Sequence, residues 1–157
     1  MAQSGASARQ RAEMLERIPW LADLSWQELE TLARYFKVSR ATKGITIFRE
    51  GDRDSYLGLI AEGRVQVIKR DDHQQAKILA ILGPGKVFGE MMLIDGEPRS
   101  ATIVAAEPAT LLLFSRDSLD TLIEEFPRLA AKFLCKLCAL LSQRLRRTSG
   151  QLVDLIE

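Results

Sequence analysis

A series of short apolar segments separated by turns fills residues 37–116, and this series limits the possible folds more than any other feature. The segments are rich in valine, isoleucine, phenylalanine and threonine, and glycine, proline or aspartate stands between them. Short strands at intervals of roughly 8 to 12 residues, with turn residues between them, are typical of a β-sandwich or β-barrel. The predicted strands are 45–48, 56–61, 65–68, 77–82, 101–105 and 109–114.

Helical patterns flank this strand-rich zone. Apolar residues recur at helical spacing from Met14 to Leu21, but Pro19 interrupts them, so residues 8–36 are predicted to form two helices. Residues 25–28 have the form of a capping box, which marks the start of the second helix. After the strands, Ser115 is predicted to cap a short helix ending near Ile123, and a long helix is predicted from Pro127 to Glu157.

The long helix carries two apolar stripes. Phe133, Leu137 and Leu140 are expected to pack on the barrel, while a second stripe alternates spacings of four and three, as in a heptad seam. One broad apolar face on a single domain is the alternative, but a seam that continues past the barrel favours a parallel homodimer. A polar residue in that seam either sets the register or contacts a ligand. The seam comprises Leu134, Cys138, Leu141, Leu145, Thr148, Leu152 and Leu155.

The length of 157 residues fits one domain. Its predicted parts are a flexible N-terminus (1–11), a β-barrel domain with N-terminal helices (12–127) and a C-terminal dimerisation helix (128–157). With 22 basic and 21 acidic residues the net charge is only +1, which makes nucleic acid an unfavoured partner. No apolar run is long enough to span a membrane, and the polar N-terminus lacks the apolar core of a signal peptide.

The sequence contains few residues that could perform metal or redox chemistry. Cys135 and Cys138 cannot form a disulfide framework, so we expect buried free thiols and a cytoplasmic location. The single histidine, His73, lies in a polar turn. A metalloenzyme of the cupin type would need several histidine and acidic ligands inside its barrel. The chain is therefore predicted not to be an enzyme, with neither catalytic nor metal-binding residues.

The segment 87–103 carries the clearest chemistry. Gly89 permits a close approach of the backbone to a ligand, and the short apolar helix that follows begins with unpaired N–H groups suited to an anion. Arg99 offers a planar fork of donors for a phosphate diester, and Ser100 adds a hydroxyl group. The carboxylate of Glu90 suits a neighbouring hydroxyl group, such as a ribose 2′-OH. An ion pair of Arg99 with Glu97 or Glu107 on the surface is the alternative.

The residues Phe88-Gly89-Glu90 and Pro98-Arg99-Ser100-Ala101-Thr102 resemble the phosphate-binding cassette of cyclic nucleotide-binding domains, in particular those of the bacterial catabolite activator (cAMP receptor) protein family. Residues 18–21, 47–52 and 60–65 also resemble landmarks of that family. The resemblance covers about residues 12–157. It implies a mainly β fold: a jelly-roll β-barrel with N-terminal helices and a long C-terminal dimer helix.

The resemblance also implies roles for individual residues. Glu90 is expected to take the ribose 2′-OH, and Arg99 the cyclic phosphate with help from Ser100 and Ala101. In the bacterial members of the family, a Thr-Ser pair on the dimer helix contacts adenine, with one residue from each subunit. Thr148 and Ser149 match this pair. Serine rather than threonine after the arginine favours cAMP over cGMP. The implied ligand-binding residues are Phe88, Gly89, Glu90, Met91, Arg99, Ser100, Ala101, Thr148 and Ser149.

These features predict a cAMP-binding homodimeric sensor that signals through its C-terminal helix to an unidentified downstream protein. A domain of the same fold that binds no ligand and only contacts other proteins is the first alternative. The second is the sensor part of a longer transcription regulator, because family members continue into a helix-turn-helix domain for which this chain has no room.

Overall fold

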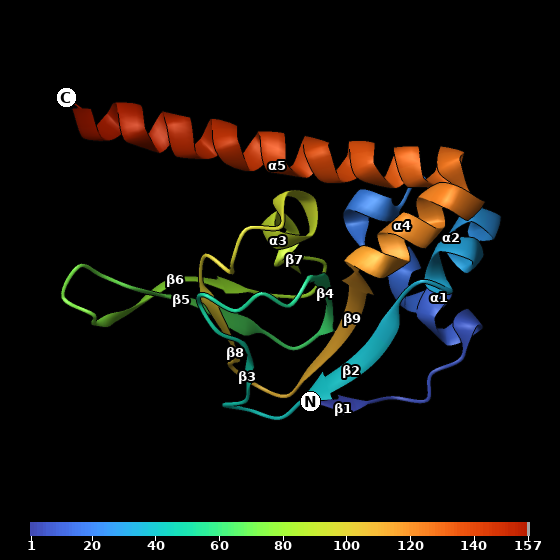
Figure 1. The fold of residues 1–157 in the computed structure, drawn as a ribbon, viewed down its shortest axis with the longest axis horizontal. Coiled ribbons are helices and arrows are strands. Elements are labelled where there is room, and N and C mark those ends of the chain that lie inside the picture. The colour runs from blue at the N-terminus through green and yellow to red at the C-terminus, as the bar shows by residue number, and fades with distance from the viewer. Residues whose placement is uncertain (157) are drawn as a thin grey trace.

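The computed structural model describes residues 1–156, which form two antiparallel sheets with helices on their flanks (Figure 1). The strands are β1 (Ala2–Gln3), β2 (Lys37–Ala41), β3 (Thr46–Phe48), β4 (Tyr56–Glu62), β5 (Val65–Arg70), β6 (Ala76–Leu82), β7 (Val87–Phe88), β8 (Thr102–Ala105) and β9 (Ala109–Ser115). The helices are α1 (Ala8–Glu16), the 3-10 turn η1 (Pro19–Leu21), α2 (Trp26–Ala33), α3 (Glu90–Asp95), α4 (Arg116–Glu125) and α5 (Pro127–Ile156).

The two sheets confirm the predicted jelly-roll fold. One has the strand order β1-β2-β9-β4-β7 and the other β3-β8-β5-β6. Strand β9 lies between β2 and β4, so the last strand of the barrel is hydrogen-bonded to two of the first ones. This pairing places residues 109–115 next to both 37–41 and 56–62.

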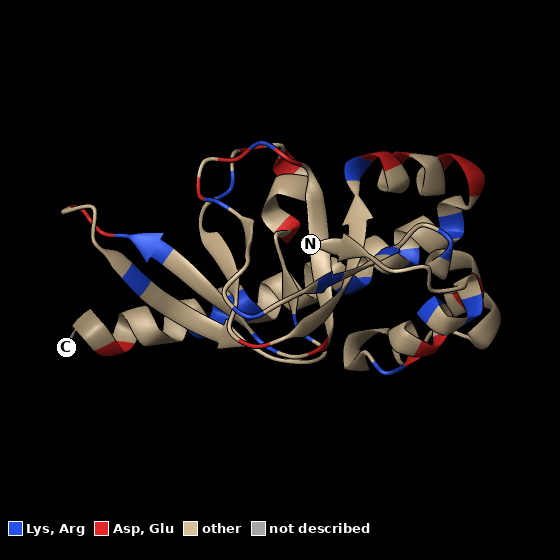
Figure 2. Ribbon diagram, turned by 90° about the horizontal axis from the view of Figure 1, so that it is seen from below, with Lys and Arg blue, Asp and Glu red and all other residues tan. Residues whose placement is uncertain are grey.

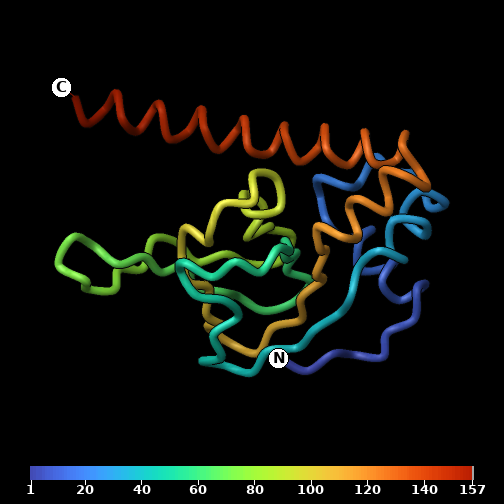
Figure 3. Tube along the Cα trace, viewed as in Figure 1, coloured from blue at the N-terminus to red at the C-terminus, as the bar shows by residue number. Residues whose placement is uncertain are grey.

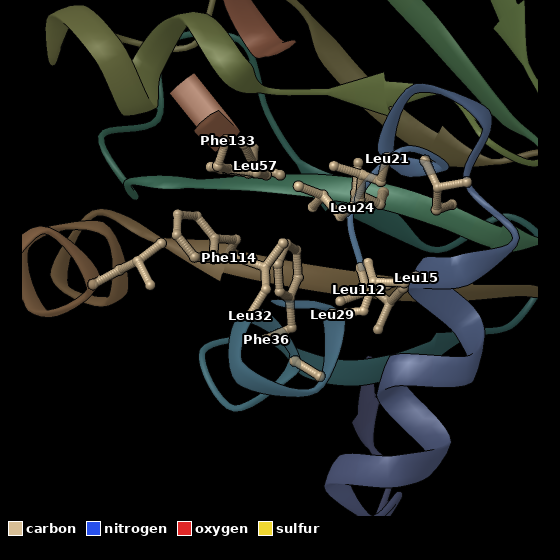
Figure 4. Packing of buried hydrophobic residues seen from close by; sticks show 14 of the residues in the cluster. Leu15, Leu21, Leu24, Leu29, Leu32, Phe36, Leu57, Leu112, Phe114 and Phe133 are labelled. Carbon is tan, nitrogen blue, oxygen red and sulfur yellow. The ribbon is translucent and has the colours of Figure 1, made fainter. Parts of the chain in front are cut away.

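The core is continuous between the first sheet and the helices. Phe36, Phe114 and Phe133 come from three distant parts of the chain and meet there (Figure 4), with ring centroids 4.9 Å apart for Phe36 and Phe114 and 5.0 Å for Phe114 and Phe133. Burial of three aromatic rings supplies several kcal/mol of stabilisation, at about 1.5–3 kcal/mol for each side chain. This cluster fixes the start of α5 on the domain.

Local capping signals are realised where the sequence predicts them. Ser25 and Glu28 form a reciprocal capping box at the start of α2, and the Ser115 side chain accepts a hydrogen bond from the Ser118 N–H at the start of α4. Helix α4 continues two residues beyond the predicted end at Ile123, to Glu125. The division into parts 1–11, 12–127 and 128–157 remains a prediction, and in the first of these parts residues 2–3 pair with β2 as β1.

Helix α5 has 30 residues and is about 45 Å long at 1.5 Å per residue. It runs along one side of the molecule and continues past the barrel (Figures 1 and 3). Its first half is held by the buried Phe133 and Leu137 and by ion pairs of Lys132 with Glu28 and of Lys136 with Asp23.

Beyond the barrel, the seam positions of α5 face solvent, Leu145 and Leu155 among them. None of the helices in residues 1–156 has the length and hydropathy needed to cross a membrane.

The predicted burial of the two thiols is wrong for this chain. Both Cys135 and Cys138 are exposed. The buried positions of this half of α5 are Leu129, Ala130, Phe133 and Leu137, which lie on the side of the helix that contacts the domain. The cysteines lie outside that stripe, so the apolar character of the segment does not place them in the core.

Candidate ligand-binding site

A cavity of about 510 Å³ lies between the segment 87–103 and the four-stranded sheet. Its walls are mainly apolar, and strands β5 and β6 contribute Val67, Ala80 and Leu82. Its charged lining includes Glu90 and Arg99 from the segment singled out in the sequence and Arg144 from α5. An apolar slot with a few convergent charged groups is the usual form of a small-molecule site.

Gly89 sets the backbone geometry at the start of α3. Its φ of 74° lies in the left-handed region, and a Cβ at this position would come within 2.5 Å of Arg99 Nη1. Both the conformation and the close approach therefore require glycine. The chain turns here from β7 into α3, and the turn brings Glu90 and Arg99 to the same cavity.

Arg99 is only 3% exposed, and the protein itself holds its guanidinium group. Nη1 donates to the Gly89 carbonyl at 2.9 Å, Nη2 to the Tyr56 carbonyl at 2.6 Å, and Nε to Asp54 Oδ1 at 3.4 Å. The group also lies 3.8 Å from the centroid of the Phe48 ring and 4.8 Å from that of Tyr56. Three of its five N–H donors are thus occupied, which fixes the plane of the fork and leaves two donors for a ligand.

The Tyr56 phenol remains neutral beside this cation. Burial, and then the nearby Asp54 carboxylate, raise the pKa of Tyr56 to about 12. Its hydroxyl group donates to the Ile47 carbonyl at 3.3 Å. The ring is thereby tied to β3 and forms a fixed wall next to Arg99.

Glu90 is 6% exposed, and its partner comes from the C-terminal helix. Arg144 Nη1 donates to Glu90 Oε1 at 2.5 Å, and Arg144 Nη2 donates to the Val87 carbonyl at 2.9 Å. The pair joins α5 to the start of α3, so the helix and the cavity share one charged contact.

The sequence matches a known family of domains. The family model for the cyclic nucleotide-binding domain matches residues 38–126. The chain belongs to the cyclic nucleotide-binding domain family. It is 37% identical over 134 residues to the cyclic AMP receptor protein of Thermus thermophilus, covering 85% of this chain and 60% of the relative. It is 32% identical over 114 residues to a CRP-like cAMP-activated global transcriptional regulator of Mycobacterium tuberculosis, covering 73% of this chain and 49% of the relative.

Solved structures show the same similarity. A cyclic nucleotide-binding domain from Methylobacillus flagellatus superposes with a TM-score of 0.85 at 33% identity, over 98% of this chain and 88% of that one. The catabolite activator protein of Thermus thermophilus superposes with a TM-score of 0.77 at 37% identity, over 87% of this chain and 62% of that one. The chain thus spans less than two thirds of the length of these Thermus thermophilus and Mycobacterium tuberculosis regulators.

The structure brings most of the predicted site residues of this cyclic nucleotide-binding domain together. Phe88 is buried and packs on Phe48, with ring centroids 5.9 Å apart. Gly58 on β4 makes room for the Phe88 ring, because a Cβ there would come within 2.2 Å of it. The predicted residues that line the cavity are Phe88, Gly89, Glu90, Met91, Arg99, Ser100 and Ala101.

Thr148 and Ser149 do not line the cavity formed by the described chain. Both are exposed on α5, and the Thr148 hydroxyl group donates to the Arg144 carbonyl of its own helix at 3.0 Å. Their expected contact with a base therefore requires either a ligand that reaches beyond the cavity or a second copy of the chain.

Arg144 is the cavity residue that sequence reasoning placed wrongly. By its sequence alone, the basic cluster of Arg144, Arg146 and Arg147 is typical of a solvated helix face or a partner site. Position 144 continues the domain-facing stripe of 130, 133 and 137 at intervals of three, four and seven residues. Extending that stripe by two helical turns would have separated Arg144 from its two neighbours.

Proposed function

We propose that this cyclic nucleotide-binding domain binds cAMP and acts as a sensor, with α5 as the output element that contacts a downstream partner. The observation that carries the proposal is the convergence of the buried Glu90 and Arg99 on one apolar-walled cavity. A cyclic nucleotide combines a singly charged phosphate diester, a ribose hydroxyl group and an apolar purine face. Each of these has a chemically matched group in the cavity.

Arg99 is suited to the phosphate. Its two remaining N–H donors correspond to the two exocyclic oxygens of a cyclic phosphate, and charge-assisted pairs of this kind are the strong hydrogen bonds of proteins. Ser100 can add a hydroxyl donor, and Ala101 lines the cavity next to it. Because the guanidinium group is already held by Gly89, Tyr56 and Asp54, little conformational entropy is lost when the phosphate binds.

Glu90 is suited to the ribose. Its Oε1 accepts from Arg144, and its Oε2 makes no hydrogen bond within residues 1–156, so a 2′-OH can donate to Oε2. Arg144 then holds the carboxylate in place from the side of α5. A ligand on Glu90 is therefore coupled to the position of the helix.

The base is proposed to lie against the apolar wall of Val67, Ala80 and Leu82. Apolar contact alone would hold either purine, so the discrimination of adenine is assigned to Thr148 and Ser149 across a homodimer. The exposed seam of α5 supports this dimer, since Leu145, Leu152 and Leu155 lie outside the contact with the domain. Ligand would favour the pose of α5 that closes over the base.

The relatives support a regulatory role. They include a cAMP receptor protein and a cAMP-activated transcriptional regulator, of which this domain matches only a part. A sensor that forms part of a longer regulator is therefore the second candidate. We propose a ligand-binding function without catalysis of its own, as expected for this regulatory family.

Calorimetric titration with cAMP, cGMP and a cyclic dinucleotide tests the proposal on one preparation. We expect binding of cAMP at micromolar or lower concentration, weaker binding of cGMP, and no binding of the cyclic dinucleotide. Binding of none of the three would instead support a domain of this fold that has only protein partners.

A further inference from the structure

We propose that Lys69 on β5 is a positioning residue for the phosphate of the ligand. It holds the peptide group between Ser100 and Ala101 so that the Ala101 N–H becomes a backbone donor to the phosphate, next to the side chain of Arg99. This role rests on the proposed binding of a cyclic nucleotide. Lys69 does not line the cavity formed by residues 1–156, so it acts through Ala101 and not by touching the ligand.

The ammonium group of Lys69 reaches the backbone of the binding segment. Its Nζ donates to the Ser100 carbonyl oxygen at 2.8 Å and lies 3.4 Å from Glu50 Oε1. The carbonyl oxygen is thus nearer than the carboxylate. Lys69 therefore binds Ser100 more closely than it binds its ion-pair partner.

A fixed carbonyl group also fixes the N–H group of the next residue. The peptide group between Ser100 and Ala101 is trans and planar, so the Ser100 carbonyl and the Ala101 N–H point in opposite directions. Ala101 lines the cavity, and its N–H donates no hydrogen bond within residues 1–156. A backbone donor without a partner at the wall of a cavity is available to an anionic ligand.

The residue on the other side of Ala101 is fastened to the same ion pair. The Glu50 N–H donates to Thr102 Oγ1 at 2.9 Å, and the side chain of that glutamate pairs with Lys69. Ala101 is therefore held through both of its neighbours while its own N–H stays free. A donor that is held in place before the ligand arrives loses little conformational entropy on binding.

The alternative is that Lys69 only forms an exposed ion pair, which contributes little to stability or binding. The stereochemistry of the phosphate distinguishes the two roles. In the Rp and Sp phosphorothioates of cAMP, sulfur replaces one or the other exocyclic oxygen, and sulfur accepts hydrogen bonds weakly. Only one of these diastereomers keeps an oxygen opposite the Ala101 N–H.

Calorimetry with cAMP and both phosphorothioates, on the parent chain and on Lys69→Met, tests the proposal. Lys69→Met should weaken cAMP and one diastereomer about fivefold, near the net value of one hydrogen bond, and the other diastereomer by less than about twofold. Lys69→Arg keeps a donor for the Ser100 carbonyl and should restore all three affinities. In NMR spectra, the Ala101 amide proton should move downfield when cAMP binds the parent, and it should move less in Lys69→Met.

Lys77→Met is the matched control, because it removes the same charge from the exposed position directly opposite Lys69 in the β5–β6 register. Figure 2 shows basic positions along this hairpin, so an effect of total charge must be separated from an effect of position. The control should leave all three affinities unchanged. The Lys69 side chain is 47% exposed, so Lys69→Met is expected to fold, and circular dichroism checks this.

Three results would overturn the role of Lys69. They are an unchanged cAMP affinity in Lys69→Met, equal losses for the two diastereomers, and the same loss in Lys77→Met. A parent chain that binds none of the three ligands would contradict the proposed function and this role together. A parent chain that binds cAMP while Lys69→Met binds equally well contradicts only the role of Lys69.

Discussion

Glu90 and Arg144 are 54 positions apart in the sequence, and Arg144 Nη1 donates to Glu90 Oε1 at 2.5 Å. This contact joins the helix that continues beyond the barrel to the carboxylate assigned to the ribose. Helix α5 is held on the domain by aromatic packing at one end and by this pair further along. A ligand that engages Glu90 therefore acts on the second of these two attachments.

Arg144→Ala should destabilise the ligand-free domain. The substitution leaves the carboxylate of Glu90 buried without its counter-charge, which costs about 1–3 kcal/mol in the free energy of unfolding. Urea denaturation followed by circular dichroism measures the change. Arg146→Ala on the same helix is the matched control, and its effect should stay within about 0.5 kcal/mol. An equal loss of unfolding free energy in both variants would show that the pairing of Arg144 with Glu90 does not stabilise the domain.

Arg99→Ala should weaken cAMP binding by about 2–4 kcal/mol, since a charge-assisted bidentate partner of the phosphate is lost. Arg99→Lys keeps the charge but not the fork that Gly89 and Tyr56 hold, so it should also bind weakly. Calorimetry gives the affinities, and circular dichroism checks that both variants fold. Parent-like affinity in Arg99→Ala would show that another group binds the phosphate.

Glu90→Ala should abolish the preference for a ribose over a deoxyribose. The parent is expected to bind 2′-deoxy-cAMP more weakly than cAMP, because Glu90 then lacks its hydroxyl partner. In the variant the two affinities should become nearly equal. The four dissociation constants form a double-mutant cycle. A coupling energy near zero would show that Glu90 does not interact with the 2′-OH.

Leu152→Glu should convert a dimer into monomers, because it places a charge in the apolar seam of α5. Val153 is 61% exposed against 57% for Leu152 but lies one position off the seam, so Val153→Glu should remain dimeric. Sedimentation velocity measures the oligomeric state of both variants.

Disulfide cross-linking tests the same seam. Facing core positions of two parallel helices lie within disulfide range, so mild oxidation should cross-link the dimer through Cys138 and not through Cys135. A parent chain that sediments as a monomer would contradict the proposed dimer contact through the seam of α5.

Thr148→Ala should lower cAMP affinity about tenfold, near the cost of one lost hydrogen bond with its desolvation. Its effect on cGMP should be smaller, since the guanine edge presents different donors and acceptors. Titration of both nucleotides against parent and variant gives the two ratios. Identical ratios would mean that Thr148 only sets the register of the helices.

Much of the fold follows from local patterns in this sequence. Short apolar segments between turn residues predict the strands β3 to β6, β8 and β9, and the capping box at Ser25 predicts the start of α2. The cassette from Phe88 to Thr102 identifies the site because its residues are close in sequence. Each of these signals depends on backbone preferences or on spacing within about 15 residues. The local sequence is therefore enough to predict these features without knowledge of the rest of the molecule.

Only the tertiary structure decided which partners those residues meet. The cage of Phe48, Tyr56 and Asp54 around Arg99 joins segments more than 40 residues apart, and the pairing of Arg144 with Glu90 depends on where α5 crosses the barrel. The apolar run around Cys135 and Cys138 predicts that both thiols are buried, yet both are exposed, because burial depends on which face of a helix the remaining elements cover. Helical spacing and strand period specify a face, and only packing between distant segments specifies what lies against it.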